Sequence, residues 1–95
     1  MHKIDAYLQK IDEYINSLEN LAYEVFKKKE KNEKIPEEFI TSVTLEVIKK
    51  TTDITYIISK LSDHVDVDDK LLRIIIRKFA EAIGFANLII DMLEA

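Results

Sequence analysis

The sequence predicts an all-α protein, an up-down bundle of three long helices at about residues 3–30, 36–62 and 67–94. The first observation behind this prediction is that 95 residues include only one Gly and one Pro, whereas a sheet protein needs many turn residues. The second is that apolar residues, 47% of the chain, recur at helical spacing. A chain of this length forms a single domain, residues 1–95, and dimerisation would extend it to a larger bundle.

The first predicted helix rests on a seven-residue repeat. Apolar residues begin each heptad, and an acidic residue follows each of the first three: Ile4, Ile11, Leu18 and Val25, with Asp5, Asp12 and Glu19. This pattern is typical of an amphipathic helix with a seam close to the coiled-coil type. Three heptads are too few for an isolated coiled coil, so we expect the seam to pack inside the bundle.

The second predicted helix begins at Pro36, because a proline followed by two acidic residues is a common helix start. Residues 39–58 are rich in Thr, Val and Ile, and residues 39–47 alternate as a strand would. A β-hairpin turning at 49–53 is therefore an open alternative. No Gly, Pro or Asn occupies the supposed turn. An unbroken seven-residue rhythm of apolar residues favours a helix instead: Ile40, Val47, Ile54 and Leu61.

The third predicted helix is capped by Asp66 or Asp68 and carries unusually many apolar residues. Sixteen of the 23 residues from 71 to 93 are apolar. We expect one face of this helix to form its share of the core: Leu71, Leu72, Ile75, Phe79, Ala82, Ile83, Ala86, Ile89, Ile90 and Leu93. A second apolar strip has no predicted partner inside a three-helix bundle: Ile74, Phe85, Leu88 and Met92.

The second strip predicts an interface. Its simplest partner is another copy of the chain in a homodimer, where Gly84 would let two backbones approach closely; the other expected partner is a larger protein complex. The sequence shows no catalytic constellation, and we do not expect an enzyme. The expected function is therefore a non-catalytic protein-interaction module that self-associates or docks on a larger partner through the third helix.

Two alternatives remain. The lysine segment 27–34 would suit a small accessory subunit of a nucleic-acid-processing assembly, with phosphate contacts from four side chains: Lys27, Lys28, Lys29 and Lys31. Because the net charge is −4 and the segment contains two Glu residues, only weak nucleic-acid binding is expected. Arg73 and Arg77 lie one turn apart and would serve a small enzyme as an anion clamp, although we expect them to pair with Glu81, Asp69 or acidic residues of the first helix.

No metal or other cofactor is expected. The chain has no Cys, which excludes thiolate chemistry. The acidic cluster does not fit a calcium-binding loop, and we expect it to cap the third helix: Asp63, Asp66, Asp68 and Asp69. His2 and His64 lack metal-ligand spacing and are expected to be solvated or capping residues. With no membrane-spanning stretch and no signal-peptide pattern, a cytoplasmic location without membrane contact is expected. The Lys-rich, amide-poor composition is a thermophilic tendency, which an A/T-rich genome would also produce.

Overall fold

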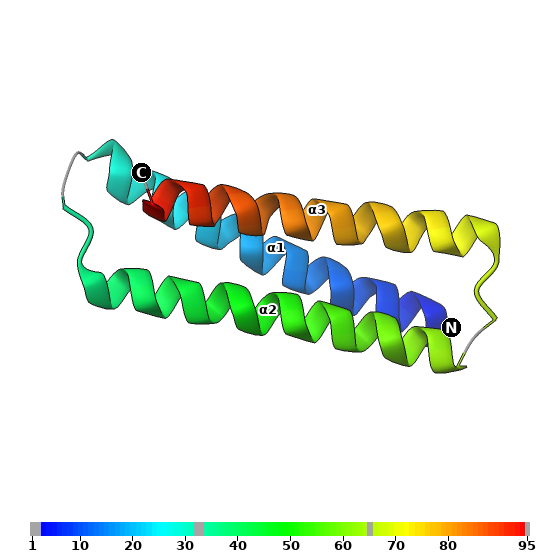
Figure 1. Ribbon diagram of the computed structural model, residues 1–95. Coiled ribbons are helices and arrows are strands. Elements are labelled where there is room, and N and C mark those ends of the chain that lie inside the picture. Colours follow the sequence, from blue (N-terminus) through cyan, green and yellow to red (C-terminus); the bar gives the residue numbers. More distant parts are fainter. Residues whose placement is uncertain (1–2, 32–33, 65, 95) are drawn as a thin grey trace.

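The computed structural model describes residues 3–31, 34–64 and 66–94. They form three helices, α1 (Lys3–Glu30), α2 (Glu37–His64) and α3 (Asp69–Glu94), which run up, down and up along the molecule (Figure 1). The predicted all-α three-helix bundle is confirmed. The bounds of α1 are those predicted, and no bound of α2 or α3 differs from its prediction by more than two residues, which is the ordinary uncertainty of helix ends.

The β-hairpin alternative for residues 39–58 is wrong, because this whole segment lies within α2. Three of its five threonines donate their hydroxyl groups to the backbone carbonyl four residues earlier: Thr44 to Ile40 at 2.7 Å, Thr51 to Val47 at 2.8 Å and Thr55 to Thr51 at 2.9 Å. Burial of Val43, Val47 and Ile54 outweighs the local β-propensity of the β-branched residues.

The residues that begin α2 and α3 explain where these two helices start. The carbonyl of Pro36 accepts the amides of Phe39 and Ile40 at 3.0 and 3.1 Å, so Pro36 stands immediately before the first helical residue. Asp68 caps α3, since its carboxylate accepts the amide of Leu71 at 2.8 Å. Of the two residues predicted as the cap of α3, the structure selects Asp68.

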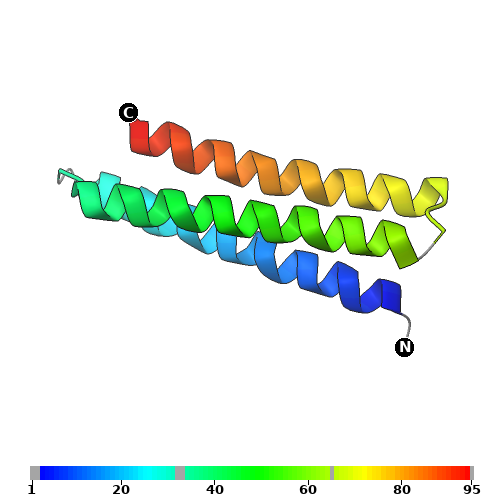
Figure 2. The same cartoon turned by 60° about the horizontal axis from the view of Figure 1, so that its bottom comes forward.

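The core runs along the bundle, and all three helices contribute to it. The buried residues of α1 and α2 follow the predicted heptad seams: Ile11, Ile15, Leu18, Ala22 and Val25 from α1, and Val43, Val47, Ile54 and Leu61 from α2. α1 packs closely against both other helices, whereas α2 and α3 contact each other least. Figures 1 and 2 show this arrangement, with α1 across the back of the α2 and α3 pair.

The core face predicted for α3 is wider than the face that is buried in the structure. Leu71, Ile75, Ala82, Ala86 and Ile89 are buried, and Ile83 and Leu93 are half-buried. Leu72, Phe79 and Ile90, which were predicted to be in the core, are exposed. The cause is the packing geometry. α3 packs mainly against α1, so its neighbours cover only a narrow arc of its circumference.

Candidate interaction surface

α3 exposes large apolar side chains on both sides of its buried arc. Leu72, Ile76, Phe79 and Ile90 are exposed on the side toward α2, and Ile74 and Leu88 are exposed on the other side. Heptad spacing explains the first group, because residues seven apart return to the same side of a helix. α3 therefore carries more apolar surface than two neighbouring helices cover.

The structure separates the four residues predicted as an interface. Phe85 and Met92 are half-buried and pack against the core, while Ile74 and Leu88 are 36% and 48% exposed. Leu88 and Met92 line a shallow depression of about 260 Å³ that also involves Tyr23 and Phe26 of α1. The predicted strip is thus not one continuous exposed surface, although its Leu88 end joins apolar residues of α1.

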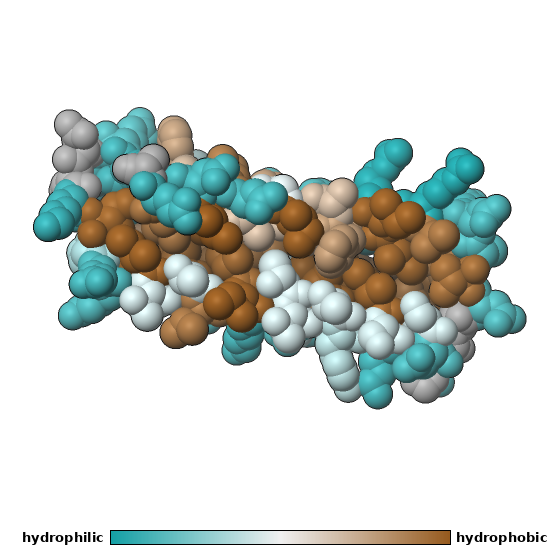
Figure 3. Space-filling view, viewed as in Figure 1, coloured by the Kyte–Doolittle hydropathy of each residue, from teal (hydrophilic) through white to brown (hydrophobic). Residues whose placement is uncertain are grey.

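A larger apolar surface lies between α2 and α3, and we call it the α2/α3 face. Two adjoining depressions of about 590 and 290 Å³ follow the boundary between the two helices, and no acidic or basic side chain lines either of them. Figure 3 shows a continuous hydrophobic band along this boundary, edged by the paler Thr and Ser side chains of α2. Its main residues are Leu45, Ile48, Thr51, Thr52, Thr55, Tyr56 and Ser59 from α2, and Leu72, Ile76, Phe79, Ile83 and Ile90 from α3.

Two of the five hydroxyl groups that line the larger depression already have partners. The hydroxyl of Thr51 donates to the carbonyl of Val47, and that of Thr55 donates to the carbonyl of Thr51. If a partner covered the face, the hydroxyl hydrogens of Thr51 and Thr55 would keep their acceptors. Burying these two groups would therefore cost little free energy. α2 thus adds two internally bonded threonine hydroxyls to the exposed Leu45 and Ile48. For Thr52, Tyr56 and Ser59, the described structure shows no hydroxyl hydrogen bond.

Sequence reasoning missed the α2 half of this face because Thr and Ser do not count as apolar. The pattern that reveals it is an absence of charge at helical spacing along one side of α2: residues 41, 44, 45, 48, 51, 52, 55, 59 and 62. On a surface helix, the side away from the core is normally charged. The outer side of α2 departs from this pattern along the listed residues.

The lysine segment is largely engaged within the chain. The amino groups of Lys27 and Lys28 lie 4.8 Å from the ring centres of Tyr23 and Phe39, and Lys29 donates to the carbonyl of Met92 at 2.8 Å. Lys31 is exposed just beyond α1, and residues 32 and 33 of the segment lie outside the described residues. Lys29 thus supplies a cation at the C-terminal end of α3, where the helix dipole favours one.

Arg73 and Arg77 lie on the outer side of α3, where they line a shallow depression of about 600 Å³ formed by α3 alone. The expected structural pairing is wrong: within the described part of the chain, neither arginine forms an ion pair. The neighbouring Lys78 pairs with Asp12 of α1 instead. Lys78 is half-buried on the side toward α1, whereas the two arginines are exposed.

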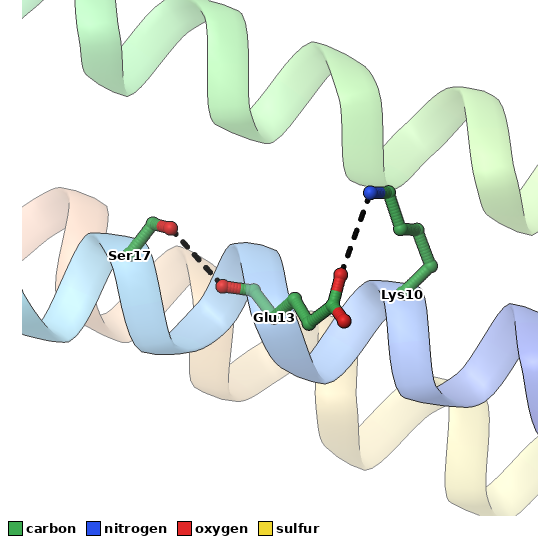
Figure 4. Close-up of polar contacts among 3 residues, drawn as sticks. All are labelled: Lys10, Glu13 and Ser17. Carbon is green, nitrogen blue, oxygen red and sulfur yellow. Dashed lines mark hydrogen bonds and ion pairs between the residues drawn. The ribbon is translucent and has the colours of Figure 1, made fainter.

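The polar side of α1 makes short-range contacts. The amino nitrogen of Lys10 lies 3.4 Å from a carboxylate oxygen of Glu13, and the hydroxyl of Ser17 donates to the carbonyl of Glu13 at 3.1 Å. Figure 4 marks both contacts. These three residues belong to the same helix and Lys10 and Glu13 are about half exposed, so the contacts are worth little for stability. They describe an ordinary solvated surface.

Over residues 3–31, 34–64 and 66–94, no three His, Cys, Asp or Glu side chains lie close enough together to hold a metal ion. Asp68 of the acidic cluster serves as the cap of α3. His2 and the side chain of His64 lie outside what the structure describes. None of the described helices has a stretch long and apolar enough to cross a bilayer. Comparisons with protein families, with curated proteins and with solved structures found no match.

Proposed function

We propose that the protein is a non-catalytic protein-interaction module that self-associates or docks on a larger partner through α3. The observation that carries this proposal is the exposed apolar surface on both sides of the buried arc of α3. Ile76, for example, is 57% exposed, so covering it would recover about half of the ~1.5–3 kcal/mol that full burial of such a side chain is worth. Adjoining exposed side chains of this kind usually mark an interface.

The nucleic-acid alternative draws less support from the structure. Three of the four lysines expected to contact phosphate already contact aromatic rings or a backbone carbonyl of the same chain. The protein-interaction proposal is therefore the one that the geometry favours.

Substitutions on α3 test the proposal. We expect light scattering behind size exclusion to give about twice the 11.1 kDa chain mass at micromolar concentration, or a tagged chain to retain a larger partner from its own cells. Ile76→Glu and Leu88→Glu, at exposed positions on the two sides of α3, should leave the helical content intact, and at least one of them should abolish association. Ile75→Glu and Ile89→Glu, at buried positions, should unfold the domain.

Circular dichroism separates the two classes of variant and serves as the folding control. Loss of association in a variant that keeps its helical spectrum supports the proposal. If Ile76→Glu and Leu88→Glu both fold and neither changes the mass nor the retention of any protein, the apolar surface of α3 is not an interface and the proposal fails.

A further inference from the structure

We propose that the α2/α3 face is covered by a second copy of this chain, related to the first by a two-fold axis that sets the two α3 helices antiparallel. This inference rests on the proposed function and goes beyond it in naming the partner, the face and the register. Three features of the molecule lead to it: the size of the face, the charges along its edge and the position of Gly84.

The face is large enough for a stable dimer. The molecule measures 49 × 21 × 19 Å, so a contact along most of one long side, roughly 1,000 Å² in projection, would reach the ~800 Å² per partner of a standard interface. The apolar part of α3, residues 72–90, extends over roughly 27 Å at the rise of an α-helix. A face as wide as two helices is covered by a second copy, whereas a single docked helix would cover only a strip roughly 10 Å wide.

The charges at the edge of α3 select the antiparallel arrangement. Arg73 and Asp91 are both exposed, and neither forms an ion pair within the described part of the chain. Because eighteen residues make five helical turns, they lie on the same side of α3. A two-fold axis midway between them, at Ala82, brings Arg73 opposite Asp91 of the second copy, and the pair occurs twice. A parallel arrangement would instead set like charges against each other.

Gly84 independently supports an axis at this point. It is the only glycine in the sequence, it lies in the middle of α3, and a Cβ atom added there would meet nothing within 4 Å. Nothing within the described chain therefore requires a glycine, although glycine weakens a helix interior. Ala80 and Gly84, both exposed, are placed symmetrically about Ala82. Gly84 lies on the same side of α3 as Arg73 and Asp91, so the lack of a side chain there leaves room for the edge of the second copy.

The same axis relates exposed residues of α2. α2 and α3 are antiparallel, and their shared depressions join Ile58 to Ile75 and residues 51–59 to Phe79 and Ile83, so the level of Ala82 on α2 is near Thr51. Leu45 and Tyr56, 60% and 58% exposed, are three turns apart, and the axis passes between them. Leu45 of each copy would then lie beside Tyr56 of the other copy. The register also brings Glu38 near Asp63 of the copy at each end, where both remain in water and repel only weakly.

Charge reversal tests the register. Sedimentation equilibrium over a concentration series should show a dimer for the unmodified chain. Arg73→Asp and Asp91→Arg should each weaken the dimer by roughly tenfold, since two pairs per dimer become repulsive. The double variant, Arg73→Asp with Asp91→Arg, should recover the affinity to within about threefold of the unmodified chain, because both pairs re-form with reversed charge. Both substitutions suit the dipole of α3 and should leave it folded.

Matched controls lie on α1, on the far side of the molecule. Lys27→Asp and Glu24→Arg make the same changes of net charge at exposed positions and should leave the dimer affinity within about threefold of the unmodified value. A net-charge effect would instead weaken the dimer equally in Lys27→Asp and Arg73→Asp, and that result contradicts the proposed register.

Three further outcomes overturn the inference. One is a chain that stays monomeric at about 100 µM; another is a double variant at least as weak as either single variant. The third is a dimer unaffected by charge reversal but lost in Leu88→Glu, which would place the contact on the other side of α3. The proposed function survives if a different protein is retained and lost in Ile76→Glu, or if the dimer forms through Leu88, so the two failures are distinguishable.

Discussion

Gly84 shows how a single residue can be unfavourable for the folded chain yet suited to a contact. An alanine methyl group at this position would meet no neighbour within 4 Å, so the folded monomer has room for it. Alanine is also the better helix former by roughly 0.5–1 kcal/mol.

We therefore expect Gly84→Ala to raise the midpoint of thermal unfolding by about 4 °C in dilute protein, a shift in line with the small size of the domain. At concentrations where the unmodified chain dimerises, the same variant should associate less tightly, because its methyl group lies near the proposed axis. Circular dichroism and sedimentation measure the two effects separately. A lower unfolding midpoint in dilute protein would mean that the surroundings of Gly84 are not open.

At the scale of the helix, the start of α3 depends on one carboxylate. Asp68 accepts the amide of Leu71 at 2.8 Å, which satisfies one of the free amides at the beginning of the helix. Asp66 lies two residues earlier, is exposed, and makes no such bond in the described structure, so it offers a matched control of the same charge.

Asp68→Ala should lower the free energy of unfolding by about 1 kcal/mol, the usual cost of losing an N-cap. Asp66→Ala should change it by less than about 0.5 kcal/mol, as is typical of an exposed site. Urea denaturation of both variants measures the difference. Equal losses would mean that the effect comes from the negative charge near the helix dipole and not from the capping hydrogen bond.

At the scale of the whole molecule, the charge balance limits what the lysine segment can do. The net charge is −4, and Lys27, Lys28 and Lys29 make contacts within the chain. Only Lys31 among the four residues expected to contact phosphate has no such contact in the described structure.

We expect any binding of nucleic acid to be weak and to disappear by about 200 mM salt, because contacts to phosphate alone fade steeply over that range. Lys31→Glu should reduce what binding there is, and Lys60→Glu, the same change on α2, should have less effect. Gel shifts at increasing salt test this. A complex that persists at this salt concentration in the unmodified chain but not in Lys31→Glu would restore the nucleic-acid alternative.

The sequence by itself determined the three helices, their bounds and the core positions of α1 and α2. Helical periodicity is a local property, and on these two helices the apolar seam is narrow enough to show which side faces inward. Even the β-branched segment 39–58 followed its seven-residue rhythm, because the core residues Val43, Val47 and Ile54 are buried only if that segment is helical.

Only the tertiary structure decided which apolar residues of α3 are inside. A helix that is apolar around most of its circumference has no pattern that identifies its neighbours, so Leu72, Phe79 and Ile90 were assigned to the core although they are exposed. The α2/α3 face likewise exists only because packing sets the uncharged side of α2 beside the uncovered side of α3. Periodicity orients a helix about its own axis, whereas the adjacency of two helix sides depends on how all three pack together.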